Sequence, residues 1–497
     1  MPIRGGSSVC GSGCRELEVI NIIVIVALGA LAGLGQAPQG LWIFTVLACA
    51  YWLLRDIKTP RAAFLHGWLF GLGYFGVTLR WIVSPFLVDP ASTGWMAPFA
   101  ILLMAIGAGL FWGLARWISH RLTPHSIAMA GLALIGAEIA RSYIFTGFPW
   151  ALLGHIWIDT PLAQIAAFGG PHLLTSITVG LAACGAWLVK RRYVAAAGPV
   201  LAVVGWVGLT LGPAPQNDGP VVRMVQPNAK QSEKWDPEKS QIFLDRMIAF
   251  TEQGDVPDLV VWPETAIPYL LQYAGPELLR VSEAARGAPT VLGINRSEGA
   301  RYYNALLVVG QGGTVSSVYD KAHLVPFGEY VPGGDLLRKV GINGFSAMTG
   351  GGFTAGDAAR TIEIEGIGTV RPLICYEGIF AEEIGTIERP RLMVLITNDA
   401  WFGADAGPLQ HLAQARLRAI EQGIPMVRVA NTGVSAMIDA RGRVTAQIGM
   451  NEANFIDARL PDALSTTVFS RYGDWPVLGL LLAAFFGVAA GARRYPN

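Results

Sequence analysis

Long runs of apolar residues crowd the first part of the chain and return once near its end. A membrane-spanning helix needs roughly 20 mostly apolar residues, with about 17 as a practical minimum. Several runs reach this length and follow one another almost without a break. Buried core helices of a soluble protein are not expected to occur in such close succession. We therefore predict a polytopic membrane protein whose eight spans are Val19–Gly35, Gly40–Leu54, Gly67–Val83, Met96–Leu114, Ile127–Phe145, Leu162–Val189, Val194–Leu211 and Val477–Ala492.

Basic residues between the predicted spans fall on alternate connections. Arg55, Lys58, Arg121 and Lys190 lie on connections that share one side, whereas "GQAPQG" and "SPFLVDPASTGW" carry no Lys or Arg. Because basic loops stay in the cytoplasm, both termini are predicted to be cytoplasmic and the long segment between spans seven and eight to be extracytoplasmic. No signal with a small-residue cleavage site is visible, so the first span is expected to act as an uncleaved anchor.

The extracytoplasmic segment has a different pattern, in which short apolar runs alternate with helix-like stretches such as Glu238–Thr251 and Gln410–Glu421. Strands as apolar as "DLVVWPE" and "LMVLITND" are typical of sheets buried on both faces. Their alternation with helices predicts a layered α/β domain. The chain is therefore expected to divide into a membrane domain at 1–213, an outer domain at 219–470, and a last span with a short tail at 475–497.

Composition narrows the classes of partner. The 497 residues are 52% hydrophobic and 15% charged, against about 25% charged in soluble domains. The net charge of +1 leaves no basic surplus to neutralise phosphates, which argues against a nucleic-acid partner. The outer domain has one cysteine, Cys375, and two histidines, His323 and His411. This set argues against a disulfide and a metal centre, and a lone buried cysteine is more often a small apolar residue than a nucleophile.

Three reactive side chains follow apolar strands in the outer domain. Glu264 ends "DLVVWPE", Lys321 follows "SVYD" and Cys375 follows "RPLI". Ligand sites of open α/β sheets lie at the carboxyl ends of strands. A thiol nucleophile needs a base or a lowered pKa, and with so few histidines a carboxylate and an ammonium would have to serve. Taken singly, Glu264 is explained as well by a charge at a helix start, and Lys321 by a solvated surface group.

Taken together, "WPE", "DK" and "CYE", in this order and spacing, resemble the Glu–Lys–Cys triad of the nitrilase superfamily. That resemblance implies an αββα sandwich for the outer domain. With seven spans before this domain and one after it, the whole chain is similar to the apolipoprotein N-acyltransferase family of the bacterial inner membrane. The motifs "TGFPW", "KWDP", "LVPFGEYVP" and "TNDAWFG" agree, whereas "MPIRGGSSVCGSGC" and "GGPHLL" depart from the family pattern.

The resemblance implies a two-step acyl transfer without a cofactor. Cys375 would attack the ester of a membrane phospholipid, with phosphatidylethanolamine as the expected donor. The α-amine of a diacylglyceryl-cysteine at an apolipoprotein N-terminus would then take the acyl chain from the thioester. Glu264 would act as general base, and Lys321 would stabilise the thiolate and the oxyanion. By similarity, the supporting and substrate-binding residues would be Glu329, Glu377, Tyr376 and Trp235.

Charged residues at membrane depth are costly and are usually paired or functional. Glu138 and Arg141 are spaced to pair on one helix face; alternatively, Arg80 or Arg141 meets the phosphate of an entering phospholipid. In the outer domain, Glu377 lies two residues after Cys375 and is expected to raise the pKa of the thiol, which would then be protonated at rest.

Two other functions would account for part of this pattern. A transporter would explain the spans, but not a large outer domain with an ordered reactive triad. A membrane-anchored nitrilase-like amidase would use the same triad with water as second nucleophile, although a tether needs only one span. The glycine-rich stretch Gly341–Gly356 fits a flexible connector and a membrane-dipping lid equally well.

Overall fold

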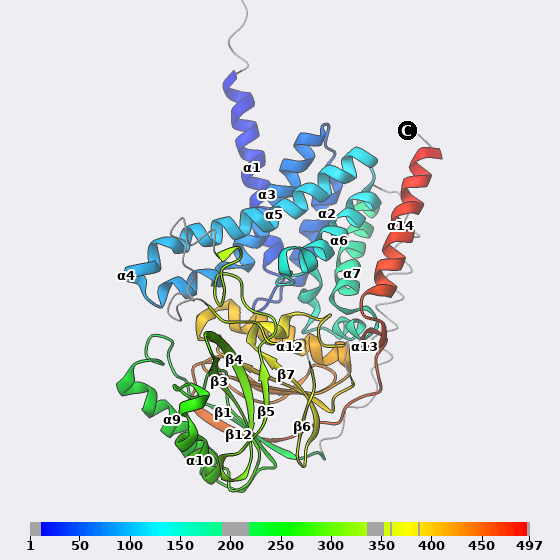
Figure 1. The fold of residues 1–497 in the computed structure, drawn as a ribbon. Helices are drawn as coiled ribbons and strands as arrows, with labels where there is room; N and C mark the ends of the chain where they lie inside the picture. The colour runs from blue at the N-terminus through cyan, green and yellow to red at the C-terminus, as the bar shows by residue number, and fades with distance from the viewer. Residues whose placement is uncertain (1–10, 191–217, 335–351, 358–359, 386–387, 495–497) are drawn as a thin grey trace, which may run out of the picture.

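The computed structural model describes residues 11–190, 218–334, 352–357, 360–385 and 388–494. Helices from the first part of the chain form a bundle at one end, and two β-sheets with their covering helices lie at the other (Figure 1). The start of the first helix and the end of the last helix both lie at the end of the bundle farthest from the sheets. The described chain therefore begins and ends on the same side of the bundle.

The bundle consists of α-helices joined by short 3-10 turns. Its α-helices are α1 (Gly11–Gly33), α2 (Trp42–Leu54), α3 (Pro60–Thr78), α4 (Pro90–Thr93), α5 (Ala97–Leu122), α6 (Ile127–Tyr143), α7 (Ala166–Val189) and α14 (Trp475–Arg494). The 3-10 turns between them are η1 (Arg80–Leu87), η2 (Gly94–Met96), η3 (Ile144–Thr146), η4 (Leu153–Trp157) and η5 (Pro161–Ile165).

Three helical segments of the described chain are long and apolar enough to cross a membrane: Pro90–Leu122, Ile127–Thr146 and Pro161–Val189. A fourth would be the pair of α3 and η1, which is bent by 49°. Shorter apolar helices lie at the predicted first, second and eighth spans, and the predicted seventh span lies outside the described residues. The structure therefore supports membrane-crossing helices but not the full number of eight.

The predicted third span, Gly67–Val83, is wrong at both ends. The helix starts at Pro60, whose fixed φ suits a first helical position, and it ends at Thr78, where the chain bends into η1. The prediction began too late because Arg61 and His66 interrupt the apolar run. In the structure His66 is buried, with its ring 6.1 Å from that of Trp52.

The predicted pair of Glu138 and Arg141 is confirmed. Arg141 Nη2 lies 3.1 Å from Glu138 Oε1, and both side chains are buried. Arg141 also donates to the carbonyl oxygens of Phe148 and Trp150, at 2.6 and 2.7 Å. With these donors used and the side chain 3% exposed, Arg141 is not free to meet a phospholipid phosphate.

The outer domain contains two six-stranded sheets, in the orders β12-β1-β2-β3-β4-β5 and β11-β10-β9-β8-β7-β6. In each sheet three neighbouring strands run parallel and the flanking strands run antiparallel. The strands are β1 (Val221–Gln226), β2 (Leu259–Val261), β3 (Thr290–Glu298), β4 (Arg301–Val309), β5 (Val315–Asp320), β6 (Ile362–Ile364), β7 (Gly368–Ile374), β8 (Leu392–Thr397), β9 (Met426–Ala430), β10 (Ser435–Ile438), β11 (Val444–Ile448) and β12 (Asn454–Arg459).

The two sheets pack face to face through apolar side chains such as Val261 and Val394. Helices α9 (Pro237–Glu252) and α10 (Gly275–Ala284) cover the first sheet, and α12 (Ala406–Gln422) covers the second. The predicted αββα sandwich is thereby confirmed. Local sequence sets the helix ends: Asp236 accepts the Glu238 N–H at the start of α9, and Gly423 ends α12 at φ 64°.

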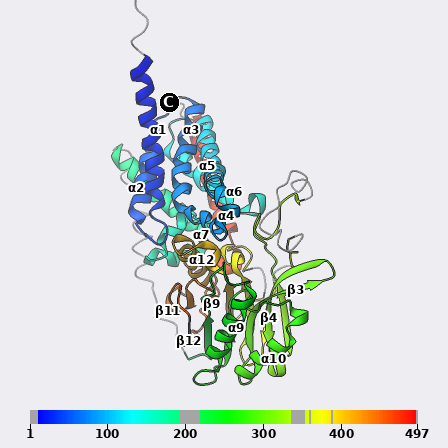
Figure 2. The same cartoon turned by 90° about the vertical axis from the view of Figure 1, so that its left-hand side faces the viewer.

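Helix α12 lies between the second sheet and the bundle (Figures 1 and 2). On one face, Ala415 and Ala419 pack against Leu395 of β8. On the other face, Leu417 packs with Leu174 of α7 in a second apolar cluster. From α12 the chain continues through the remaining strands to the short helix α13 (Val468–Tyr472), which leads into α14. One helix therefore belongs to the cores of both parts of the protein.

Candidate active site

Glu264 follows β2 at the edge of the first sheet. Its Oε1 accepts from Asn304 Nδ2 at 2.7 Å, and its Oε2 accepts from the Asn398 N–H at 2.8 Å. The next residue, Thr265, adopts a φ of 47°, which is unusual for a β-branched residue. The side chain of Glu264 is 7% exposed. A strained turn and two donors thus hold this buried carboxylate in one orientation.

Lys321 follows β5 and is almost fully buried. Its Nζ lies 2.8 Å from Glu329 Oε1 and 3.7 Å from Glu264 Oε1. Burial alone would lower the pKa of Lys321, but the carboxylates of Glu329 and Glu264 outweigh it and hold the pKa above its ordinary value. Lys321 therefore carries a positive charge next to the Glu264 carboxylate.

Cys375 begins the 3-10 turn η10 (Cys375–Ile379) at the end of β7. It is buried and adopts a φ of 51°, a strained conformation for a residue other than glycine. Burial and then the Glu264 carboxylate raise the pKa of the thiol, while Lys321 and a hydrogen bond with Thr397 act in the opposite direction. The thiol thus lies within electrostatic reach of Glu264 and Lys321, so the structure brings the three predicted residues together.

Glu377 does not act on the thiol as expected. Its Oε1 accepts from the Tyr319 hydroxyl and the Ala322 N–H, both at 2.8 Å, and its Oε2 accepts from the Ile374 N–H at 2.7 Å. The direction expected for the pKa of Cys375 is right, but the causes are burial and Glu264. Glu377 instead joins the loop after Lys321 to the turn that carries Cys375.

Tyr376 lies where the outer domain meets the bundle. Its ring is 5.5 Å from that of His323 and 5.0 Å from that of Phe380, and its hydroxyl donates to the Gly147 carbonyl at 3.4 Å. Gly147 belongs to the "TGFPW" motif, which follows α6. Tyr376 and Phe380 share an apolar cluster with the bundle helices. The residue after Cys375 is therefore packed under the membrane domain.

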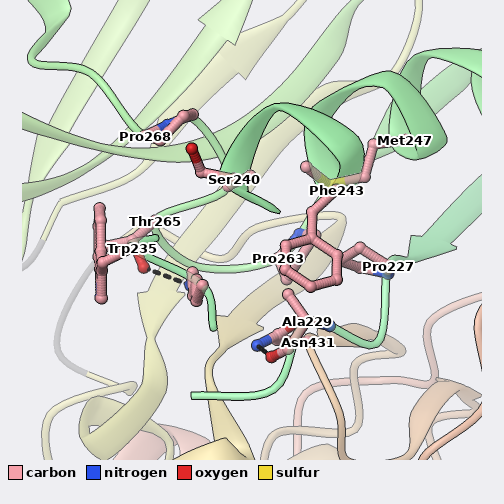
Figure 3. A pocket seen from close by; sticks show the side chains of 12 residues that line it. Pro227, Ala229, Trp235, Ser240, Phe243, Met247, Pro263, Thr265, Pro268 and Asn431 are labelled. Atoms are coloured by element: carbon pink, nitrogen blue, oxygen red, sulfur yellow. Dashed lines mark hydrogen bonds between the residues drawn. The ribbon is translucent and has the colours of Figure 1, made fainter. Parts of the chain in front are cut away.

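Trp235 lies at a small pocket of the first sheet, with Thr265 beside it and Phe243 and Asn431 farther along (Figure 3). Trp235 is 43% exposed. Its neighbour Lys234 is buried, and its Nζ donates to the Glu264 carbonyl at 3.0 Å and to Thr265 Oγ1 at 2.7 Å. Burial lowers the pKa of Lys234 to about 8. Trp235 is thus linked to Glu264 through the backbone that Lys234 holds.

Three residues that orient the site were missed from sequence: Lys234, Asn304 and Asn398. Lys234 and Asn398 lie inside the quoted motifs "KWDP" and "TNDAWFG", so those motifs were the available signal. Asn304 lies within β4, where an apolar strand pattern gave no sign of its inward amide. Within the described parts of the chain, no group of three His, Cys, Asp or Glu side chains is placed to hold a metal ion.

Comparison with known proteins covers both parts of the chain. The model of the carbon-nitrogen hydrolase family matches residues 221–467, and that of the apolipoprotein N-acyltransferase N-terminal domain matches residues 28–184. An apolipoprotein N-acyltransferase of Bradyrhizobium diazoefficiens is 36% identical, with 95% of this chain and 96% of that protein covered. One of Caulobacter vibrioides is 37% identical, with 88% of each covered.

Among solved structures, an amidase from Nesterenkonia sp. is similar to 54% of this chain and 98% of its own, with 16% identity and a TM-score of 0.37. The relatives named above extend over nearly the whole length of the chain, from the bundle to the outer domain. By this identity over both domains, the chain belongs to the apolipoprotein N-acyltransferase family.

Proposed function

We propose that this protein moves an acyl chain from a membrane phospholipid to the N-terminal amine of an apolipoprotein, through a thioester on Cys375. The observation that carries this proposal is the buried Cys375 at the end of β7, close enough to the adjacent Lys321 and Glu264 to feel their charges, with the next residue, Tyr376, packed against the bundle of apolar helices. Relatives that carry the name apolipoprotein N-acyltransferase over the same length support it.

In the first step, Glu264 takes the proton of the Cys375 thiol as its sulfur attacks the ester carbonyl carbon. Charge develops on the carbonyl oxygen, where the Lys321 ammonium and a backbone N–H near Tyr376 stabilise it. The ester C–O bond then breaks, and the leaving alkoxide takes the proton from Glu264. The products are the acyl-thioester and a lysophospholipid. General acid–base catalysis of this kind contributes about 10²–10⁴-fold to a rate.

In the second step, the α-amine of the diacylglyceryl-cysteine attacks the thioester carbonyl. The C–S bond breaks, an amide forms, and the amine proton passes through Glu264 to the departing sulfur. The thiol of Cys375 is thereby regenerated, and neither step needs a cofactor. Glu329 and Glu377 support the triad through the bonds described above, and Tyr376 and Trp235 line the path of the lipid substrates.

The proposal includes an orientation in the bacterial inner membrane. The membrane domain (1–213) and the final segment (475–497) supply eight spans, and the outer domain (219–470) is periplasmic. Its support is that α1 begins and α14 ends at the same end of the bundle, away from the sheets (Figure 1). Arg55 and Lys58 lie between α2 and α3, and Arg121 lies in the last turn of α5, and the basic-loop rule assigns these positions to the cytoplasmic side.

Intact mass spectrometry of the purified protein with phosphatidylethanolamine tests the first step. We expect the wild-type mass to increase by one acyl chain, which hydroxylamine or a diacylated lipopeptide then releases. Cys375→Ala should show no increase, and the released chain should appear on the lipopeptide amine. Cys184→Ala is the matched control, because it removes a thiol of the bundle instead.

Each other outcome has a defined meaning. An adduct with phosphatidylglycerol but not with phosphatidylethanolamine would correct the donor and keep the reaction. If no adduct forms with either lipid and the protein hydrolyses small soluble amides, the acyl-transfer proposal is wrong and the alternative function, a membrane-anchored amidase, takes its place.

A further inference from the structure

His411, in the first half of α12, contacts the backbone of the nucleophile. Its Nε2 lies 3.1 Å from the carbonyl oxygen of Cys375. A carbonyl oxygen can only accept a hydrogen bond, so Nε2 carries a proton and donates it. The imidazole is fully buried. It lies 5.9 Å from the indole of Trp150 and 5.7 Å from the ring of Phe402, ring centre to ring centre.

The imidazole is held by two further charged side chains that are also fully buried. Asp399 Oδ1 lies 3.1 Å from His411 Nδ1, and Arg428 Nη2 lies 2.6 Å from Asp399 Oδ2 and 3.1 Å from the same Nδ1. A protonated Nδ1 donates to Asp399, and an unprotonated Nδ1 accepts from Arg428. The ring therefore keeps its orientation in either protonation state, with Nε2–H aimed at Cys375.

Burial of this network has a high cost in desolvation free energy. Moving a charged group out of water costs on the order of several kcal/mol per ion, which pairing with an opposite charge then offsets. Burial alone would raise the pKa of Asp399, but Arg428 and His411 outweigh it and hold the pKa below its ordinary range. Thr397 also donates to Asp399 Oδ1, at 2.8 Å. A buried cluster in which Asp399 is paired with both Arg428 and His411 is thus built around one bond to the nucleophile's carbonyl.

That bond acts on an amide that the reaction uses. The carbonyl of Cys375 and the N–H of Tyr376 belong to the same planar peptide unit. A hydrogen bond donated to the carbonyl polarises the unit and strengthens its N–H as a donor. The same bond fixes the plane of this peptide, which follows the strained φ of 51° at Cys375. His411 thus controls both the direction and the strength of the Tyr376 N–H.

We propose that His411 is a positioning residue for thioester formation, which holds and polarises the Cys375–Tyr376 peptide so that the Tyr376 N–H stabilises the oxyanion of the phospholipid ester. The inference rests on the proposed acyl transfer and adds to it a residue of the helix shared with the membrane bundle. Trp150 connects the bundle to this part of α12, because its Nε1 donates to Oε1 of Gln410, the residue before His411, at 2.7 Å.

Two reactions of the same thiol separate this role from a merely structural one. Iodoacetamide is attacked at a tetrahedral carbon and forms no oxyanion, whereas the phospholipid ester forms one. We expect His411→Leu to slow acyl-thioester formation by about 10–100-fold, somewhat less than the 10²–10³-fold typical for removal of a direct oxyanion donor. Alkylation of Cys375 should stay within about threefold of wild type, since it needs no such donor.

His411→Gln keeps an amide N–H donor at nearly the same reach and should restore most of the acylation rate. His411→Asn draws that donor back by one methylene and should behave like His411→Leu, and it replaces the leucine variant if that variant does not fold. His66→Leu is the control, because it removes a buried imidazole of α3.

Equal losses of alkylation and acylation in the leucine or asparagine variant would overturn the proposal, because the ring would then only support the fold. So would a glutamine variant as slow as the leucine variant. A wild-type protein that is alkylated but forms no acyl adduct would refute the acyl-transfer function itself, and the inference with it.

Discussion

The ammonium of Lys321 lies 2.8 Å from the carboxylate of Glu329. The proposed general base, Glu264, is farther from the same nitrogen, at 3.7 Å. Glu329 therefore takes the closer share of the lysine's charge. Glu264 is held instead by hydrogen bonds from the Asn304 amide and the Asn398 N–H, at 2.7 and 2.8 Å, and not by a tight ion pair with the lysine.

Glu329→Gln should slow acyl-thioester formation by about 100-fold, through a weaker general base. With the charge of Glu329 removed, Lys321 is expected to move onto Glu264 and form a tight ion pair that competes with the thiol proton for the carboxylate. The measurement is the rate of the acyl mass increase under single-turnover conditions. Glu452→Gln is the matched control, since Glu452 also accepts from a backbone N–H but lies at the turn between β11 and β12. An unchanged rate in Glu329→Gln would show that Lys321 does not move.

Alkylation of Cys375 by iodoacetamide should keep rising with pH beyond 8.5, the ordinary pKa of a thiol, by about tenfold per pH unit. The sign follows from burial and the Glu264 carboxylate, which raise the pKa of this thiol and leave less thiolate at a given pH. Lys321→Met should lower the rate further, because the lysine opposes that rise. A plateau below neutral pH would contradict the buried, protonated thiol.

Lys234→Met should both destabilise the protein and slow thioester formation. It leaves the Glu264 carbonyl and the Thr265 hydroxyl without their donor, and an unsatisfied buried polar group costs about 1–3 kcal/mol. Thermal unfolding in detergent and the rate of acyl adduct formation measure the two effects. Lys230→Met, at an exposed position of the same loop, should change neither. A stable Lys234→Met with the wild-type rate would remove Lys234 from the site.

Gln410→Ala should weaken the contact between the bundle and α12. Gln410 accepts from Trp150 Nε1 at 2.7 Å and donates to the Ala37 carbonyl at 3.0 Å, so the substitution leaves a buried indole N–H and a partly buried carbonyl without these partners. The expected loss in the free energy of unfolding is about 1–3 kcal/mol, mainly from the buried indole N–H of Trp150. It is measured as a lower midpoint of thermal unfolding, with the exposed Gln447→Ala as control. Equal midpoints for the two variants would argue against this link.

The order and spacing of the motifs resemble those of a known family, and that resemblance implied the sandwich. The meeting of Glu264, Lys321 and Cys375 could also be expected from the pattern, because each residue follows a strand and strand ends gather at sheet edges. Their catalytic roles remain predictions. The direction in which each side chain points could not be predicted in the same way. Glu377 lies beside Cys375 in sequence, yet the turn that begins at φ 51° carries its carboxylate to the Ile374 N–H.

The remaining errors have related causes. Asn304 looked like any other position of an apolar strand, although its amide binds Glu264. The start of α3 was placed seven residues late because Arg61 and His66 interrupted an apolar run that tertiary packing tolerates. In each case the deciding partner is distant in sequence, and local pattern carries no information about it.

The position of α12 has a consequence for how the two parts of this protein can be separated. A free-standing hydrolase would expose the outer face of this helix to water, but here Leu417 and Ile420 are covered by the bundle. Released from the membrane domain, residues 218–470 would present that apolar face to solvent and lose the support behind His411 and Cys375. The membrane helices are thus part of the folding unit of the enzyme, and a soluble fragment would carry the triad without the surroundings that hold it in place.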